Sequence, residues 1–486
     1  MARGAAGILS AALTEGLGTR FAAAWAGGSD GTRPNILFAL ADDWGYPHAG
    51  AYGDPVVKTP TFDRLAREGV LFDSAFVASP SCTPSRSSIL TGRHFWTHEE
   101  GSVLWGEFSS RHRTYPDALE AVGYHVGCTR KGWGPGQSTR EDGRNPAGPA
   151  FADFATFLAA RPERAPFCVW FGSFDPHRPY EKGTGVASGM ELADVPVPAC
   201  LPDNGVTRSD LCDYYFEVER FDSEVGGLIA TLEEMGELDN TLVVMTGDNG
   251  IPFPRCKANL YDGGVRVPLA VRWGQRVPPG ARVDDMVTLC DLAPTFLEAG
   301  GLEPPAATTG RSLIPILQAG VSGQAGPARN AVYYGIERHA WVREGGLGYP
   351  MRAVRTASYL YIRNYEPGRN PAGDPTAVSD LGLYGDIDNG PTKTYLLEHR
   401  DDPEVAPLFE LACGKRRAEE LYDLRADPDQ LTNVADRPEH AERLGELRRT
   451  LQDEMTSTGD PRASGPTEVF VRYPYHGNVR SNPGGR

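Results

Sequence analysis

Acidic and amide side chains follow two strand-like runs of the chain, each just beyond the end of the run. Asp42 and Asp43 come after the apolar run PNILFAL, and Asp248 and Asn249 come after the run NTLVVMT. Ligands of open α/β sheets bind beyond the carboxyl ends of the strands, so these positions can carry chemistry. A single Asp-Asp pair is more often a helix cap or a solvated loop. Two such pairs, however, offer four side-chain oxygens to one ion, which favours a hard divalent cation.

Two further strand-like runs end next to basic side chains. Lys131 follows the short strand predicted at 124–128, and His177 follows the run PFCVWFGSF at 166–174. Taken alone, a lysine is usually solvated and a histidine usually makes a structural hydrogen bond. Four strand ends that carry metal ligands and cationic donors together describe a site for an oxyanion.

The segment SCTPSRSSILTG, residues 81–92, combines a cysteine, a proline and an arginine. Pro84 suits the first turn of a helix, which places Cys82 just before the helix amino terminus. There the helix dipole and the free N–H groups favour anions and lower the pKa of a thiol. Arg86, four residues on, is within reach of the same anion or of residue 82. We therefore expect an activated nucleophile beside a metal, although a cysteine near a helix start is more often a core residue.

These residues require a sheet whose strand ends meet, and the rest of the chain predicts one. Apolar runs of strand length alternate with stretches of helical spacing, which indicates a large, mostly parallel α/β sheet flanked by helices. We expect strands at 34–40, 124–128, 166–174, 240–246 and 267–272, and helices at 59–69, 115–122, 214–235 and 291–299.

The length of 486 residues exceeds what a single small core accommodates. We expect a catalytic domain at 33–320 and, after a Gly/Ala/Ser-rich linker, a smaller C-terminal α+β subdomain at 330–460. Two adjacent strand-like runs at 351–364 indicate an antiparallel sheet, and helical spacing at 434–455 indicates a helix in the same subdomain. Residues 461–486 have the composition of a polar tail.

The first 32 residues form an N-terminal extension. It contains a short apolar run, 5–13, which is followed by Glu15 and an Ala/Gly-rich stretch. This pattern is that of a degenerate export signal. If the segment acts as such a signal, the protein is periplasmic or secreted, and otherwise it is cytoplasmic.

The composition excludes several classes of protein. With 48 basic and 64 acidic residues the formal net charge is −16, so the overall field does not attract nucleic acid. A content of 40% hydrophobic residues excludes a disordered chain, and no apolar stretch reaches the roughly 20 residues of a membrane helix. Eight cysteines without a C-x-x-C pair provide neither a disulfide framework nor a zinc site. An anionic substrate must therefore be met by a local basic pocket.

The motif C-T-P-S-R, followed by S-S-I-L-T-G, resembles the signature C-x-P-S-R of type I sulfatases. The segment KANLYDGGVRVP, which begins at Lys257, is similar to the K-x-x-x-x-[DE]-G-G-x-R-x-P segment of that family, and ELYDLRADP at 420–428 resembles its C-terminal ending. The similarity covers residues 33–455. It implies the alkaline-phosphatase-like fold and the hydrolysis of a sulfate ester or sulfamate.

The resemblance also implies a role for each matching residue. Cys82 would be oxidised to formylglycine by a formylglycine-generating enzyme or an equivalent, and its hydrate would attack sulfur. Arg86 would support that hydrate, and His177 would steady or protonate the leaving group. Lys131 and Lys257 would neutralise the sulfate oxygens. The ligands of one calcium ion would be Asp42, Asp43, residue 82, Asp248 and Asn249.

Four segments most resemble the heparan N-sulfatase (N-sulfoglucosamine sulfohydrolase) branch of the family. They read DNGIPFP, FDPHRP, GRSLIPIL and YPMRAVRT. The resemblance therefore implies a small sulfated sugar such as N-sulfoglucosamine as the substrate. The alternatives are an O-sulfatase acting on another carbohydrate or an aryl sulfate, a related phosphodiesterase or phosphonate hydrolase, and a noncatalytic relative that binds anions.

Two departures from the family pattern bear on the mechanism. Sulfatases carry a histidine two residues after the first active-site lysine, whereas this chain has Lys131-Gly-Trp133. We expect either His177 or another histidine, such as His98, to take over its role. The second departure is Lys257, which stands where the human-type heparan N-sulfatases have arginine.

Overall fold

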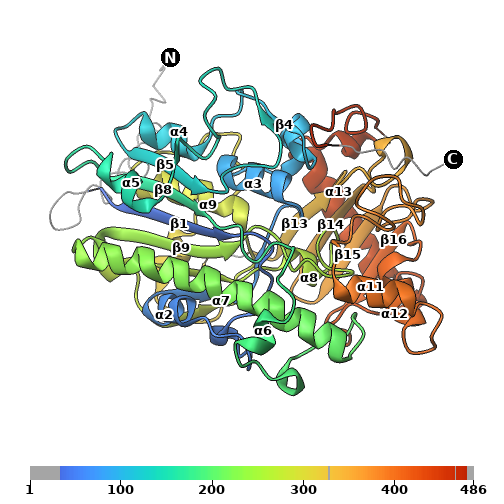
Figure 1. The fold of residues 1–486 in the computed structure, drawn as a ribbon. Coiled ribbons are helices and arrows are strands. Elements are labelled where there is room, and N and C mark those ends of the chain that lie inside the picture. The colour runs from blue at the N-terminus through green and yellow to red at the C-terminus, as the bar shows by residue number, and fades with distance from the viewer. Residues whose placement is uncertain (1–32, 327–328, 466, 479–486) are drawn as a thin grey trace, which may run out of the picture.

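The computed structural model describes residues 33–326, 329–465 and 467–478 (Figure 1). The export signal proposed for residues 1–32 lies outside these residues, as does the end of the predicted polar tail, 479–486.

A sheet of eight strands forms the centre of the larger part of the molecule. Its middle strand is β1 (Asn35–Ala41), which pairs in parallel with β9 (Thr241–Gly247) on one side and β8 (Phe167–Gly172) on the other. Strand β5 (His125–Arg130) extends the sheet in parallel beyond β8. The remaining strands are β2 (Val70–Phe72), β7 (Ala150–Phe151), β10 (Leu269–Arg272) and β11 (Ala281–Val283), in the overall order β11-β2-β10-β9-β1-β8-β5-β7.

The prediction of a mostly parallel sheet is confirmed, with one exception. The run predicted as a strand at 267–272 forms β10, which pairs antiparallel with both β9 and β2. All other pairs in this sheet that join described strands are parallel. Because parallel neighbours end at the same edge, the residues that follow β1, β9, β8 and β5 are brought together there.

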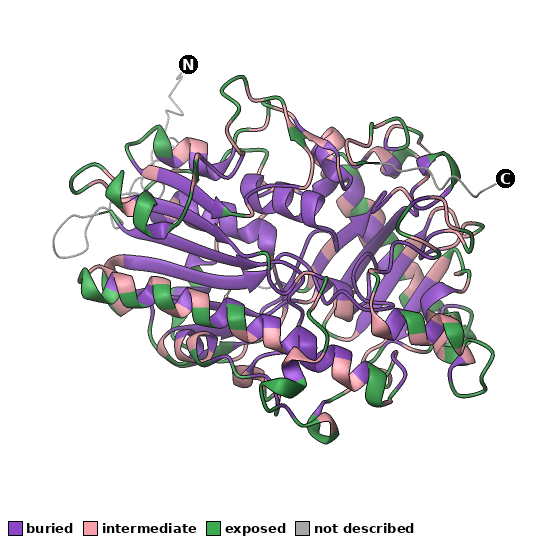
Figure 2. Ribbon diagram, in the orientation of Figure 1, coloured by how far each residue is buried: buried purple, intermediate pink, exposed green. Residues whose placement is uncertain are grey.

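Strand β1 is buried on both faces, which explains its unbroken apolar sequence (Figure 2). Leu37 and Ala39 face a core formed with α2 (Pro60–Glu68) and the long helix α7 (Gly205–Glu234). Phe38 and Leu40 face a second core, formed with α3 (Cys82–Thr91), α4 (Tyr115–Glu120) and α9 (Leu292–Ala299). The sheet is therefore covered by helices on both sides, as the alternation of elements predicts (Figure 1).

Helix α7 begins earlier than expected, at Gly205 rather than Tyr214. Asn204 caps it, since its side-chain oxygen accepts hydrogen bonds from the N–H groups of Val206 and Thr207. The first turns carry polar and charged side chains, which conceal the helical spacing on which the prediction depends.

The C-terminal part contains the predicted antiparallel sheet, and the prediction is confirmed. Its strands, in spatial order, are β13 (Ala331–Ile336), β14 (Met351–Thr356), β15 (Tyr359–Asn364) and β16 (Glu419–Asp423). One face packs against α13 (Ala441–Ser457) through Leu447, Leu451 and Met455. The other face contributes Leu360 and Ile362 to the same core that holds α3 and α9. This shared core holds the C-terminal sheet beside the strand ends of the large sheet.

Among the described residues, no helix combines the length and the apolar composition that crossing a bilayer requires. The eight cysteines are all free. Other short helices are η1 (Gly50–Tyr52), α5 (Phe154–Ala159), α6 (Thr184–Ala187), α8 (Asp262–Val265), α10 (Ile314–Ala319), α11 (Pro391–Glu398) and α12 (Ala406–Cys413).

Candidate active site

The strand ends bring the predicted metal ligands into one cluster. Asp42 and Asp43 follow β1, and Asp248 and Asn249 follow the adjacent strand β9. Ligand atoms of Asp42, Asp43, Cys82 and Asp248 all lie within 4.8 Å of one another. The side-chain amide of Asn249 donates to Asp43 Oδ1 at 2.7 Å, and the Asp43 N–H donates to Asp248 Oδ1 at 3.0 Å. Asp43 adopts a φ of 74°, which is strained for a residue other than glycine and is held by these contacts.

This cluster has the chemistry of a site for a divalent cation. Asp42, Asp43 and Asp248 are at most 1% exposed, so three carboxylates share a volume without solvent. Burial raises the pKa of Asp43. Burial acts the same way on Asp42, but Lys131, His177 and Arg86 hold the pKa of that carboxyl well below its usual range. Buried carboxylates require a compensating positive charge, and three carboxylates in one cluster suit a hard divalent cation.

Cys82 is the first residue of α3 and faces the cluster. Its Sγ lies 3.4 Å from Asp42 Oδ1 and 3.8 Å from Asn249 Oδ1. The lowered thiol pKa expected from the helix dipole is wrong: burial and the neighbouring Asp42 carboxylate raise the pKa of Cys82 well above its ordinary value. At the amino terminus of this helix, the effects of desolvation and adjacent carboxylates on the thiol pKa outweigh the effect of the helix dipole. The unmodified thiol is therefore protonated and is a poor nucleophile.

Arg86 lies one turn along α3 from Cys82, and its side chain holds neighbouring parts of the site in place. Its Nε is 2.8 Å from Asp248 Oδ2, and its Nη1 donates to the carbonyls of Lys131 and Gly132 at 3.0 and 2.8 Å. The side chain is fully buried. Arg86 thus fixes one metal ligand and the loop that carries Lys131, rather than lining the open cavity.

Lys131 and Lys257 place two ammonium groups on the acidic cluster. Lys131 forms an ion pair with Asp42, and Lys257 Nζ lies 2.6 Å from Asp43 Oδ2. Although burial favours neutral amines, the Asp42 carboxylate raises the pKa of Lys131, and Asp388 together with Asp43 raises the pKa of Lys257. Both lysines are therefore charged and available to an anion in the cavity.

His177 lies beside Asp43 and lines the cavity. Its Nδ1 is 2.6 Å from the carbonyl of Arg178, and its Nε2 is 3.8 Å from Asp43 Oδ2. The segment is anchored by Arg178, whose guanidinium makes two hydrogen bonds of 2.8 Å to Asp210. The side chain of His177 is 37% exposed, so it can contact a substrate in the cavity.

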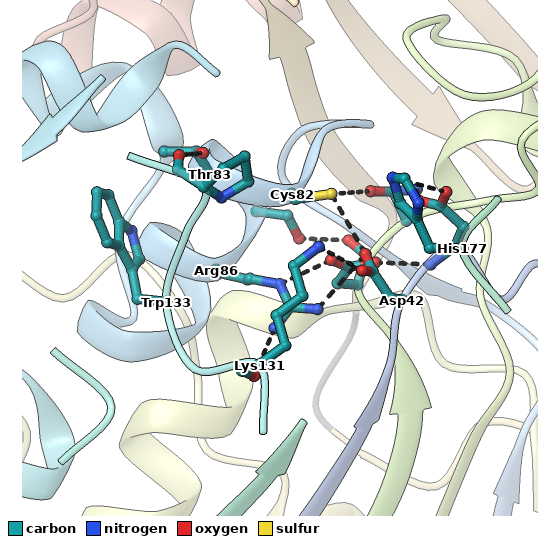
Figure 3. A network of polar contacts seen from close by, with 12 residues as sticks. Asp42, Cys82, Thr83, Arg86, Lys131, Trp133 and His177 are labelled. Atoms are coloured by element: carbon teal, nitrogen blue, oxygen red, sulfur yellow. Dashed lines mark hydrogen bonds and ion pairs between the residues drawn. The ribbon is translucent and has the colours of Figure 1, made fainter. Parts of the chain in front are cut away.

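The cavity in front of this cluster measures about 880 Å³ and is built by both parts of the protein. Figure 3 shows Cys82, Arg86, Lys131 and His177 around Asp42, with Trp133 set apart from the carboxylates. The residues of the large part that line the cavity include Asp42, Cys82, Trp105, Lys131, Trp133, His177 and Lys257. The C-terminal part adds His339, Trp341, Asp388 and Tyr475.

The lining residues of the C-terminal part are missing from the sequence prediction. His339, Trp341, Asp388 and Tyr475 lie in irregular segments, and none of them is part of a motif or follows a strand of the parallel sheet. Tyr475 lies within the segment predicted to be a polar tail. Asp388 belongs to the site through its pairing with Lys257, at 3.1 Å, and its carboxylate oxygen clusters with ligand atoms of Asp43 and His177 within 4.8 Å.

Trp133 stands where the sulfatase pattern has a histidine. Its only polar side-chain atom is bonded to Ser87 and is not free to meet an anion. Its Nε1 donates to Ser87 Oγ at 2.9 Å, and its ring packs against Phe108. His98 is not a replacement, because its Nε2 lies 2.6 Å from Thr91 Oγ1, its Nδ1 lies 3.1 Å from the Phe95 carbonyl, and it is absent from the cavity wall. Of the two histidines named from the sequence, only His177 faces the cavity.

Comparison with known proteins agrees with this arrangement. The sulfatase family model matches residues 34–302, and the model for the C-terminal part of N-sulphoglucosamine sulphohydrolase matches residues 256–370. The chain is 31% identical to N-sulphoglucosamine sulphohydrolase of Homo sapiens, over 90% of this chain and 92% of that protein. It is 24% identical to N-acetylglucosamine-6-O-sulfatase of Bacteroides thetaiotaomicron, over 87% of this chain and 86% of that protein.

Solved structures show the same fold at lower sequence identity. One, determined in complex with its substrate D-glucosamine-2-N,6-O-disulfate, has a TM-score of 0.64 and 21% identity, covering 90% of this chain and 100% of that chain. A phosphonate monoester hydrolase from Silicibacter pomeroyi also has a TM-score of 0.64, with 19% identity over 92% of this chain and 100% of that chain. With the family model covering more than half of its length, and with the strand-end cluster in place, this chain belongs to the sulfatase family.

Proposed function

We propose that this sulfatase removes the sulfate of N-sulfoglucosamine units in sulfated sugars. The proposal rests on which stretch of the chain supplies residues to the cavity wall. The stretch 256–370, which matches the C-terminal part of N-sulphoglucosamine sulphohydrolase, supplies Lys257, His339 and Trp341 to the cavity. Some of the residues that surround the sugar would therefore come from the stretch that matches a model of that branch.

We further propose that the nucleophile forms from Cys82 after translation. The raised pKa of the buried thiol disfavours attack by cysteine itself. Formylglycine at this position, when hydrated, supplies an oxygen nucleophile and a second hydroxyl through which the sulfate can later be released. The place of residue 82 at the start of α3, against Asp42 and Asn249, points that group into the cavity.

Calcium fits the cluster of carboxylates and would be held by Asp42, Asp43, Asp248 and Asn249 together with residue 82. When bound, it supplies positive charge that favours the ionised form of an oxygen nucleophile and attracts the sulfate oxygens. Arg86 keeps Asp248 in position through the 2.8 Å contact of its Nε. The protein's own contribution is thus a rigid, water-poor arrangement of ligands.

The remaining side chains bind the substrate and handle the leaving group. Lys131 and Lys257 present ammonium groups that orient and neutralise the sulfate. In its doubly protonated form His177 is placed to donate a proton from Nε2 to the departing amine, since its Nδ1–H donates to the Arg178 carbonyl and its Nε2 lies 3.8 Å from Asp43 Oδ2. The net charge of −16 means that attraction of a sulfated sugar is confined to this pocket.

The decisive experiment compares turnover of three substrates by the same preparation. We expect a higher kcat/KM for N-sulfoglucosamine than for glucosamine 6-O-sulfate, and little activity on a phosphonate monoester. A preference for the 6-O-sulfate would show an O-sulfatase, and a preference for the phosphonate would show a phosphonate hydrolase. Mass spectrometry of the peptide containing residue 82 should show formylglycine in active protein, and Cys82→Ala should fold but lose turnover.

A further inference from the structure

A second histidine lies in the wall of the cavity, contributed by the C-terminal part. His339 follows β13 and is 6% exposed. Its Nδ1 lies 2.9 Å from Ser81 Oγ. Ser81 is fully buried and directly precedes Cys82, at the N-cap of α3. The imidazole is therefore attached to the residue next to the proposed nucleophile.

The other ring nitrogen of His339, Nε2, is not engaged by Ser81, and the residue lines the cavity. Within the described part of the chain, no hydrogen bond engages its Nε2, and the side chain lines the cavity together with Cys82 and Lys257. Among the described residues Ser81 Oγ has no other acceptor for its hydroxyl proton, so the hydroxyl can donate to Nδ1. When Ser81 donates to Nδ1, the ring proton resides on Nε2, and the neutral imidazole presents an N–H donor to the cavity.

The segment around His339 is held firmly on both sides. The N–H of Ala340 donates to Asp386 Oδ1 at 3.0 Å. The guanidinium of Arg338 donates to the carbonyls of Tyr473 and Pro474, at 3.0 and 2.8 Å. Such anchoring keeps a donor in place, which is the property that makes a donor effective toward an anion.

Burial, supported by two nearby basic groups, favours the neutral ring of His339. Burial, together with the nearby ammonium group of Lys257 and with His177, lowers the pKa of His339 to about 4, against the opposing effect of Asp386 and Asp388. At neutral pH the residue thus offers a hydrogen bond without adding charge.

We propose that His339 is a catalytic residue that donates a hydrogen bond from Nε2 to the sulfate group of the substrate, beside residue 82. This proposal rests on the proposed function, because it assumes a sulfated substrate in the cavity. His339 would give the cavity a histidine donor next to the nucleophile. Trp133 cannot supply one, because its only polar side-chain atom donates to Ser87. The donor would then come from a different part of the chain than Lys131.

The test uses full-length His339→Ala, His339→Gln and Ser81→Ala, with His399→Gln on the surface as the matched control. His339→Ala should lower kcat/KM by about 10²-fold, the cost of removing one preorganised donor. His339→Gln, which keeps an N–H donor, should recover part of this loss, and added imidazole should partly restore His339→Ala. Ser81→Ala should lose less than His339→Ala, because it removes only the group that orients the ring. Each rate is divided by the fraction of formylglycine found by mass spectrometry.

Binding of inorganic sulfate separates this proposal from the proposed function. Titration calorimetry should show an increase of about tenfold in Kd for sulfate in His339→Ala relative to wild type, whatever the true substrate is. Equal sulfate affinity of the two proteins would overturn the proposal even if the wild type is an active sulfatase. A loss of turnover that Ser81→Ala copies in full, and that imidazole does not restore, would also overturn it, since the histidine would then only position residue 82.

Discussion

The ammonium group of Lys257 lies 2.6 Å from Asp43 Oδ2, although the two residues are 214 positions apart in the chain. The same Nζ is 3.1 Å from Asp388 Oδ2. One lysine therefore joins the end of β1, the loop after β9 and a segment of the C-terminal part. The charge of Lys257 compensates two carboxylates, and in the proposed function it also receives the sulfate, so binding and stability would be coupled at this residue.

Lys257→Met should lower both activity and stability. The side chain of Lys257 is 4% exposed, and its removal leaves Asp43 with no ammonium partner, which costs about 3–5 kcal/mol for a buried pair. We expect the midpoint of urea unfolding to fall and kcat/KM to drop by at least about 10²-fold. Lys182→Met, at an exposed lysine, serves as the control and should leave both values unchanged. Wild-type stability in Lys257→Met would contradict the coupling.

Removal of calcium should destabilise the wild-type protein but not a ligand variant. A ligand present at 100 times its Kd stabilises the native state by about 2.7 kcal/mol, so a chelator should lower the melting temperature of the wild type. Asp248→Asn should contain less calcium by elemental analysis, and the chelator should leave its melting temperature unchanged. Asp142→Asn, in an exposed turn, is the control. If Asp248→Asn retains calcium and activity, the assignment of the metal site is wrong.

His48 should make the protein less stable in mild acid. Burial lowers the pKa of His48 to about 4, against an ordinary value of 6.5. The folded state then binds fewer protons than the unfolded state between these values, so stability is lost as the pH falls from about 6.5 to 4, by at most about 1.4 kcal/mol per pH unit for this group. Urea unfolding at pH 7 and pH 4.5 measures this loss.

His48→Gln removes the titrating group and should show a smaller fall in stability between the two pH values than the wild type. His399→Gln, in which a half-exposed histidine is replaced, should keep the wild-type difference. An identical pH dependence in His48→Gln and wild type would show that other groups cause the acid sensitivity.

The aromatic rings at the cavity wall should affect substrate affinity more than turnover. Tyr475 lies 6.3 Å from Trp105 and 5.8 Å from Trp341, measured between ring centroids, and all three line the cavity. Because ring faces pack against the C–H groups of sugars without touching the reacting atoms, Trp341→Ala and Tyr475→Ala should raise KM by about 3- to 10-fold, the value of one aromatic contact. Their kcat should stay near that of the wild type.

Tyr395→Ala is the control for these variants, because Tyr395 stacks on His399 and does not line the cavity. Steady-state kinetics with the preferred sulfated sugar provide the comparison. A fall in kcat without a change in KM would place these rings in the chemical step rather than in substrate binding.

Much of the site follows from the sequence because it depends on local patterns. The unbroken apolar runs predict strands that are buried on both faces, and parallel strands bring their carboxyl ends to one edge. Asp42, Asp248, Lys131 and His177 each follow such a strand, so their convergence is a consequence of topology alone. Cys82 and Arg86 lie in a short motif whose helical geometry is also local.

The tertiary structure decided what depends on packing between distant segments. His339, Asp388 and Tyr475 reach the cavity from irregular segments whose neighbouring residues pack into three different cores. The same packing excludes water around Cys82, which raises its thiol pKa where the helix dipole alone predicts the opposite. Patterns in the sequence encode the ends of strands and helices, but burial and the electric field at a residue depend on which segments fold against it, and only the assembled protein determines those.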